Sequence, residues 1–206
     1  MSERYLYRGI KRFTDVLGGI VGLIVFFPIT LWIAARIKLE DGGPILYSQV
    51  RVGENGQKFS LYKFRSMVVG AHSLKNVLEQ KNESDGPIFK IKDDPRVTKI
   101  GKFMRKHSLD EIPQFINVIQ GNMSLVGPRP ALPEEVEVYS EYELQRLGSK
   151  PGLTGLWQVS GRSNLSFEKM VQLDIAYIEK KSLLTDIVIL FRTVIQMFST
   201  SDNGAF

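Results

Sequence analysis

The sequence predicts a mostly helical α+β protein, in which an N-terminal membrane helix precedes a compact domain with a short β-hairpin. Three observations predict this fold class. An uncharged apolar run occupies residues 16–35. Two short segments rich in aromatic and aliphatic residues flank the turn-forming residues 53–56. Much of the remaining chain spaces its apolar residues three and four positions apart, as amphipathic helices do.

The apolar run is long enough for a bilayer, because twenty residues at about 1.5 Å each extend about 30 Å. Pro28 lies inside it and removes one helical hydrogen bond. Basic residues flank both ends, and basic flanks favour the cytoplasmic side. They are Arg4, Arg8, Lys11 and Arg12 before the run and Arg36 and Lys38 after it.

We therefore expect a re-entrant helix, kinked at Pro28, that enters and leaves the membrane on the cytoplasmic face. A kinked single span with a short outside tail is the alternative. On the first interpretation residues 1–40 form the membrane-inserted segment, and residues 41–206 form a cytosolic domain with interfacial helices.

Residues 45–47 and 59–64 are expected to form the hairpin. Strand alternation would place Phe59, Leu61, Lys63 and Arg65 on one face. The two cations fit either a solvated edge or a wall that binds a phosphate. After the hairpin we expect a surface helix from about residue 69, then a loop to residue 85. Residues 93–96 (DDPR) are a turn signal, and become a metal or phosphate site only if the fold brings them to Asp110.

Residues 105–130 hold an acidic pair, Asp110 and Glu111, close to several basic residues. Ser108 is predicted to cap a helix, with Glu111 completing a capping box. The apolar residues that follow have helical spacing: Ile112, Phe115, Ile116 and Ile119. Acids in a first turn complement the helix dipole, which is one explanation of the pair. The other is a phosphate site, in which arginines hold the anion and the carboxylates supply a metal ligand and a nucleophile.

Helices are also expected at residues 134–147, 167–181 and 183–198. Asp174 lies in the apolar face of the second, so we expect an arginine or backbone donors against it. The third is short for a membrane span, and we favour a helix in the headgroup region over a core helix. Trp157 fits either stacking on a base or sugar, or packing in the protein or at the membrane interface.

The net charge of +5 suits nucleic acid, an anionic membrane or a phosphorylated substrate. The absence of cysteine excludes disulfides, thiolate chemistry and cysteine-based zinc sites. Nucleic acid is disfavoured as a partner, since neither interleaved aromatics nor a continuous basic face is apparent. Two alternatives to an enzyme are a membrane-tethered basic binding module and a scaffold that docks partners. Both leave the acidic pair without a role.

An ordered set of motifs resembles the signature of the bacterial sugar transferases, and more narrowly of the monotopic polyprenyl-phosphate phosphoglycosyl transferases. The resemblance extends from about residue 11 to the C-terminus. The motifs are residues 63–67 (KFRSM), 94–98 (DPRVT), 108–114 (SLDEIPQ), 124–130 (SLVGPRP), 151–155 (PGLTG) and 160–162 (SGR), with Asp174 and Tyr177 beyond them.

This resemblance implies transfer of a sugar-1-phosphate, with a hexose expected, from a UDP-sugar to undecaprenyl phosphate with release of UMP. That reaction is the first membrane step of polysaccharide or glycoconjugate synthesis, such as that of exopolysaccharide or capsule. It also implies a monotopic protein among the lipids of the bacterial inner membrane, with its catalytic domain on the cytoplasmic face. The sequence leaves the oligomeric state open, a homo-oligomer included.

By the same resemblance Asp110 is the nucleophile that forms a phosphosugar-enzyme intermediate, and Glu111 is the Mg²⁺ ligand, with Asp110 beside it at the metal site. The candidates for binding substrate phosphates are Lys63, Arg65, Arg105, Arg129 and Arg162. One departure concerns the membrane helix, because Phe27 precedes Pro28 where some members have serine.

Overall fold

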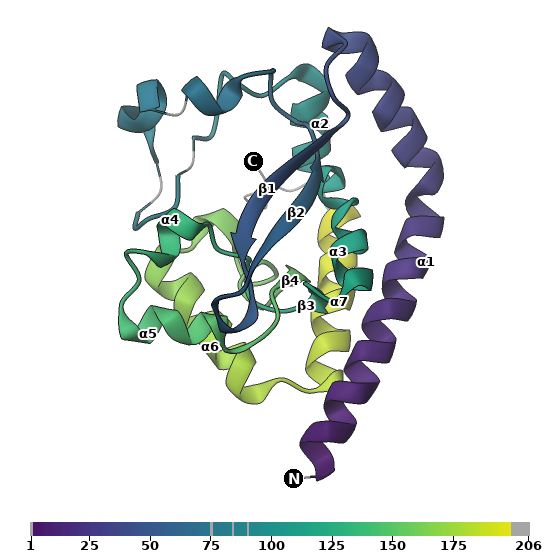
Figure 1. The fold of residues 1–206 in the computed structure, drawn as a ribbon, viewed down its shortest axis with the longest axis vertical. Coiled ribbons are helices and arrows are strands. Elements are labelled where there is room, and N and C mark those ends of the chain that lie inside the picture. The colour runs from purple at the N-terminus through teal and green to yellow at the C-terminus, as the bar shows by residue number, and fades with distance from the viewer. Residues whose placement is uncertain (1, 75, 84, 90, 199–206) are drawn as a thin grey trace.

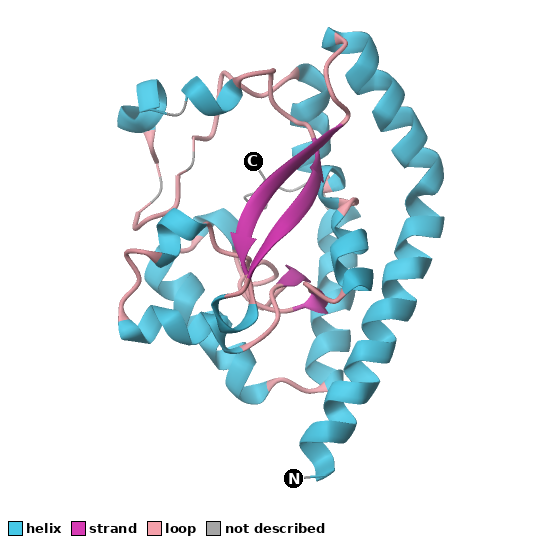
Figure 2. Ribbon diagram, in the orientation of Figure 1, coloured by secondary structure: helices cyan, strands magenta, loops and turns pink. Residues whose placement is uncertain are grey.

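The computed structural model describes residues 2–74, 76–83, 85–89 and 91–198. It confirms a mostly helical α+β fold with two small sheets (Figure 2). A single long helix, α1 (Ser2–Asp41), runs along one side of all the other elements (Figure 1).

Helix α1 continues without interruption through Pro28. In the described part of the chain, α1 is the one helix whose length and composition would allow it to cross a membrane. Its inner face packs on the domain and buries Ile33 and Ile37 completely. Its outer face leaves large apolar side chains exposed, among them Phe13, Leu17, Ile24, Phe27 and Leu31.

Polar contacts attach both ends of α1 to the same domain. Near its start, Arg12 donates to the carbonyls of Val118 and Ile119, at 2.7 and 2.6 Å, where α3 (Gln114–Gln120) ends. Near its other end, the Glu40 carboxylate accepts from the first two backbone N–H groups of α2 (Lys99–Lys106), at 2.8 and 3.2 Å. The domain therefore holds α1 over most of its length.

Glycines let α1 approach α3 and its neighbours closely. A Cβ atom on Gly22 would lie 2.6 Å from ring atoms of Phe115, and one on Gly19 would lie 2.9 Å from Ile119. Because real Cβ atoms do not approach so closely, larger residues at these positions would push α1 away from the domain.

The predicted hairpin is confirmed. Strands β1 (Leu46–Val52) and β2 (Lys58–Phe64) are antiparallel. The first extends to residue 52 where the sequence pattern indicated residue 47, and the second begins one residue earlier than predicted. The side-chain amide of Asn117 fixes the hairpin against α3: it donates to the Ser60 carbonyl at 2.7 Å and accepts from the Tyr62 N–H at 3.0 Å.

A second sheet was not predicted. Strands β3 (Ser124–Val126) and β4 (Gly152–Thr154) pair in parallel, and each has three residues. Such strands are too short to show alternation. They approach closely at two glycines, since a Cβ on Gly152 would lie 2.1 Å from the backbone nitrogen of Gly127.

Two helix predictions need correction, and one helix was not predicted. The segment after residue 69 forms 3₁₀ turns, η2 (Ala71–Leu74) and η3 (Asn76–Lys81), in place of an α-helix. The expected helix at residues 134–147 is divided into α4 (Pro133–Val136), α5 (Glu141–Leu144) and the 3₁₀ turn η5 (Gln145–Gly148). The division occurs because Ser140 and Glu143 form a capping box that starts a new helix. Helix α2 was not predicted at all.

Helices α6 (Phe167–Lys180) and α7 (Leu183–Phe198) are confirmed. The expected partner of Asp174 is Arg146, whose Nε and one terminal nitrogen donate to Oδ2 at 2.9 and 2.7 Å. This pair is buried beside Tyr139 and Phe167, which stack near the guanidinium.

Candidate active site

The acidic pair lies on a tight 3₁₀ turn, η4 (Leu109–Glu111), between α2 and α3. The predicted cap at Ser108 is wrong. Ser108 has a left-handed φ of 55° and makes no side-chain capping hydrogen bond. Helix α3 instead begins at Gln114, after Pro113, because proline has no N–H with which to extend the preceding turn.

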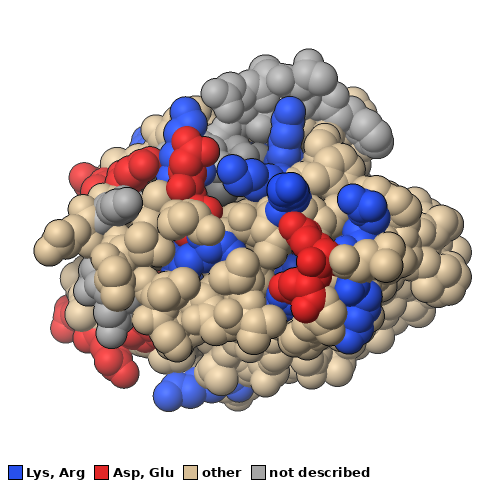
Figure 3. All heavy atoms as spheres, turned by 90° about the horizontal axis from the view of Figure 1, so that it is seen from above, with Lys and Arg blue, Asp and Glu red and all other residues tan. Residues whose placement is uncertain are grey.

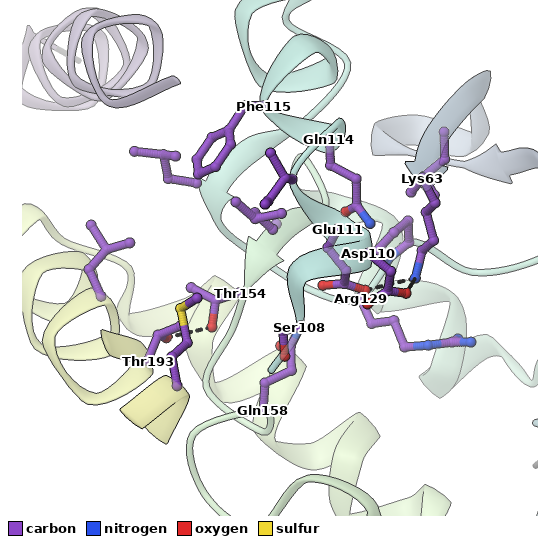
Figure 4. Close-up of a pocket in the computed structure, with 18 of the residues that line it drawn as sticks. Lys63, Ser108, Asp110, Glu111, Gln114, Phe115, Arg129, Thr154, Gln158 and Thr193 are labelled. Carbon is purple, nitrogen blue, oxygen red and sulfur yellow. Dashed lines mark hydrogen bonds and ion pairs between the residues drawn. The ribbon is translucent and has the colours of Figure 1, made fainter. Parts of the chain in front are cut away.

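A cavity of about 480 Å³ opens beside the acidic pair, and its two sides differ in chemistry (Figure 4). One side carries charged residues, with Lys63 reaching toward Asp110 and Glu111. The other side is apolar and comes from α1, α3, β3 and α7. The basic residues of the lining are Arg51, Lys63, Arg105, Arg129 and Arg162, and the apolar ones include Phe26, Phe115, Leu125, Leu190, Val194 and Met197.

Lys63 joins the two carboxylates. Its Nζ lies 2.8 Å from Glu111 Oε1 and 3.8 Å from Asp110 Oδ2. Burial raises the pKa of Asp110, and Lys63 and Arg105 offset this only in part. Desolvation also acts to raise the pKa of Glu111, but the ion pair with Lys63 and a hydrogen bond from Gln114 bring it below the usual value. The two adjacent acids therefore differ in proton affinity.

Three predicted arginines also line the cavity. Arg105 donates from Nε to Ser66 Oγ at 3.0 Å, and its burial lowers its pKa. Arg129 donates to the buried carboxylate of Glu135, with a shortest distance of 2.9 Å. Arg162 begins the 3₁₀ turn η6 (Arg162–Asn164) with a left-handed φ of 49°. The structure thus brings Lys63, Arg105, Arg129 and Arg162 together around the acidic pair.

Arg65 does not join them. It is buried at the far end of the hairpin, where Nε donates to the Pro44 carbonyl at 2.6 Å and the terminal nitrogens pair with Asp41. The prediction grouped Arg65 with Lys63 by strand alternation. Strand β2 ends at Phe64, so Arg65 lies outside the strand and the alternation does not apply to it. Residues 93–96 do not line the cavity either, and within that turn Asp94 pairs with Arg96 at 2.6 Å.

Arg51 is a cavity residue that the sequence analysis missed. In the hairpin register it opposes Phe59, which places it on the same face as Lys63. Its terminal nitrogens donate to the Pro130 carbonyl and to Gln49 Oε1, both at 3.0 Å, while its buried Nε has no hydrogen-bond partner among the described residues. Burial and the nearby Arg129 lower its pKa to about 10, so it stays charged at neutral pH. The hairpin register was the signal that could have identified it.

The described residues contain no group of three or more histidine, cysteine, aspartate or glutamate side chains arranged to hold a metal ion. Asp110 and Glu111 remain a suitable donor set for Mg²⁺. This cation commonly binds through one or two carboxylates, with substrate phosphates and water completing its shell.

The chain matches the family model for bacterial sugar transferases over residues 6–200. It is 48% identical over 192 residues to the galactosyl transferase CpsE of Streptococcus agalactiae, covering 93% of this chain and 42% of that protein. It is 43% identical over 188 residues to the exopolysaccharide production protein ExoY of Rhizobium meliloti, covering 89% of this chain and 83% of that protein.

The undecaprenyl-phosphate galactose phosphotransferase of Salmonella typhimurium is 43% identical over 195 residues, which cover 90% of this chain and 40% of that protein. The chain therefore spans about two fifths of the length of CpsE and of the Salmonella protein, and most of the length of ExoY.

Proposed function

Because the chain belongs to the bacterial sugar transferase family, we propose that it transfers a sugar-1-phosphate from a UDP-sugar to undecaprenyl phosphate and releases UMP. The expected group is a hexose-1-phosphate, and the expected pathway is exopolysaccharide or capsule synthesis. The names of the ExoY and Salmonella proteins support this assignment. The observation that carries it is the acidic pair set between a basic and an apolar wall. A reaction that moves a phosphorylated sugar from water to a lipid needs both walls.

In the first step, the Asp110 carboxylate attacks the phosphorus that bears the sugar. A bond forms between the carboxylate oxygen and phosphorus, and the phosphorus–oxygen bond to UMP breaks. The raised pKa of Asp110 favours this role, since a more basic carboxylate is the better nucleophile once it is ionised. Lys63, at 3.8 Å, favours the ionised form.

In the second step, a phosphate oxygen of undecaprenyl phosphate attacks the same phosphorus. The bond to Asp110 breaks, the carboxylate is restored, and the sugar phosphate leaves as part of a lipid diphosphate. Because the acceptor is already an anion, neither step needs a histidine base.

The basic wall has a direct role in both steps. Arg51, Arg105 and Arg162 face a cavity in which the donor diphosphate would place negative charge, and guanidinium groups bind phosphate through paired N–H donors. A magnesium ion held by Glu111 and Asp110 would supply further masking of that charge. This metal site stays a proposal based on the donor set.

The decisive experiment mixes the enzyme with UDP-glucose or UDP-galactose in detergent without lipid and measures its intact mass. The two-step route predicts an adduct of one hexose phosphate on the peptide that contains Asp110, and ping-pong kinetics when lipid is added. Asp110→Asn should abolish adduct and turnover, whereas Glu111→Gln should slow both steps. Sequential kinetics with no adduct in active enzyme would instead indicate direct transfer between the two substrates.

We also propose that α1 is re-entrant, bending at Pro28 within the cytoplasmic leaflet, and that α7 lies in the headgroup region. Two observations support this topology. Arg12 and Glu40, near opposite ends of α1, both bind the same domain. A helix that crossed the membrane would place its two ends on opposite sides and could not make both contacts. Figure 3 views the end of the molecule where α1 finishes, and shows lysines and arginines there, interspersed with acidic side chains. Basic groups at such a position favour anionic headgroups.

Because the chain has no cysteine, single cysteines test this topology directly. Ser2→Cys and Ser60→Cys should both be shielded from an impermeant thiol reagent in intact cells, and both should react after permeabilisation. Labelling of position 2 alone in intact cells would indicate a single span.

A further inference from the structure

The apolar side of the cavity has a consistent composition. Helix α7 contributes Leu190, Val194 and Met197 at helical spacing, together with Thr193, and α1 contributes Phe26. Within the described part of the chain, none of the residues that these two helices add to the lining is charged. Figure 4 shows Thr193 on the side of the cavity opposite Lys63.

This side is poorly suited to a sugar or a nucleotide, since those ligands need polar partners. Its polar group on α7 is the Thr193 hydroxyl, which is already engaged. Thr193 Oγ1 lies 2.7 Å from Thr154 Oγ1 and donates to the Ile189 carbonyl at 2.9 Å. An apolar ligand fits this wall better, because it gains by leaving water and requires no hydrogen bond.

The apolar wall also continues to the outer surface. Val194 lines the cavity although 53% of it is exposed, so it lies at the mouth. Its neighbours on α7, Phe191 and Ile195, are exposed on the outer face, as are Val25 and Phe27, the neighbours of Phe26 on α1. Apolar surface therefore extends from the outer faces of both helices to the cavity that holds the acidic pair.

We propose that the space between α1 and α7 is a lateral entrance for the acceptor lipid, in which the hydrocarbon next to the lipid phosphate lies along Phe26, Leu190, Val194 and Met197. The phosphate then reaches Asp110 from the membrane side, while the UDP-sugar binds against the arginines on the opposite side. This inference rests on the proposed function and names the acceptor subsite of the same cavity.

The two-step route allows a test that separates acceptor binding from donor chemistry. Val194→Asp places a charge at the mouth, at a position exposed enough to tolerate it. Adduct formation from UDP-sugar without lipid should stay within about twofold of wild type. Discharge of the adduct by undecaprenyl phosphate should slow by about tenfold or more, the effect of losing apolar burial equal to two methylene groups.

Phe191→Asp is the matched control, because it adds the same charge to the outer face of the same helix at a residue that does not line the cavity. In detergent it should discharge its adduct at nearly the wild-type rate. Val194→Gln provides a milder change if the aspartate variant does not fold, and it should slow discharge selectively.

Discharge at the wild-type rate in both Val194 variants would overturn the entrance. Equal loss of adduct formation and discharge would also overturn it, because Val194 would then serve the donor side or the fold. Failure of wild-type enzyme to form any adduct would count against the two-step mechanism instead, so the two failures are distinguishable.

Discussion

Glu135→Gln tests how the partly buried Arg129 is held beside the cavity. Glu135 is only 1% exposed, and its carboxylate accepts from both terminal nitrogens of Arg129 and from the backbone N–H of Leu132 at 2.9 Å. Glutamine preserves the shape of the side chain and one oxygen acceptor. It removes the negative charge that compensates Arg129.

Breaking a buried ion pair by removing one partner lowers the free energy of unfolding by about 3–5 kcal/mol. Because glutamine retains some of the hydrogen bonds, we expect Glu135→Gln to lower it by about 3 kcal/mol. For a domain of this size each kcal/mol lowers the thermal midpoint by roughly 2–4 °C, so we expect a fall of roughly 6–12 °C. The effect should depend on pH. Burial acts to raise the pKa of Glu135, but Arg129 holds it below the usual glutamate value. The stability difference should therefore be complete at neutral pH and shrink as the pH falls through that lowered pKa.

The assay is thermal unfolding of the detergent-purified protein at neutral and acidic pH. Glu137→Gln, at an exposed position that follows the same short helix, is the control and should change the free energy of unfolding by no more than about 0.5 kcal/mol. The double variant Arg129→Met, Glu135→Gln should recover stability relative to Glu135→Gln, because it no longer buries an uncompensated charge. A midpoint for Glu135→Gln equal to that of the control, or a double variant with simply additive losses, would refute this account of Arg129.

Three further predictions follow from the cavity and from the packing of α1. Asp110→Asn should abolish turnover but raise the thermal midpoint at neutral pH. Because burial raises the pKa of Asp110, the gain in thermal midpoint should grow as the pH rises above the usual aspartate range. An unchanged midpoint at neutral pH would contradict this prediction. Arg51→Met should raise the KM for UDP-sugar by about tenfold or more through loss of a charge-assisted phosphate contact, measured by UMP release, and an unchanged KM would remove Arg51 from the donor site. Gly22→Ala should lower the free energy of unfolding by about 1–3 kcal/mol, because its Cβ would meet the Phe115 ring. Gly9→Ala is the control: it has open space around it and should raise the free energy of unfolding by about 0.5–1 kcal/mol. Similar effects of both variants in chemical denaturation would show that α1 does not pack closely on α3.

Some residues of the donor subsite belong to sequence motifs, whereas other residues of the cavity, including those of the proposed lipid entrance, reach it only through pairing or packing with distant segments. Lys63 and the acidic pair belong to motifs in the sequence, and their closeness was expected from the family resemblance. Arg51 joins them only through the hairpin register, and Val194 only through the docking of α7 beside α1. Neither residue belongs to a motif that the sequence analysis singled out. The hairpin register could have identified Arg51, whereas no local pattern indicates which side chains of α7 line the cavity.

The sequence by itself determined the features that depend on neighbouring residues. The apolar run predicted a long helix, alternation and a turn-forming segment predicted the hairpin, and the position of Asp174 in an apolar stripe predicted a buried partner. Proline and a capping serine also acted locally, but their effects at Pro113 and Ser140 were missed, which misplaced the start of α3 and merged α4 with α5. What only the tertiary structure decided are the contacts between distant segments. Asp41, at the end of α1, engages Arg65 away from the cavity, while the close approach of Gly127 and Gly152 forms a sheet from strands too short to show a pattern. The physical reason is that periodicity reports which face of an element is buried, whereas the partner of that face depends on the packing of the whole chain.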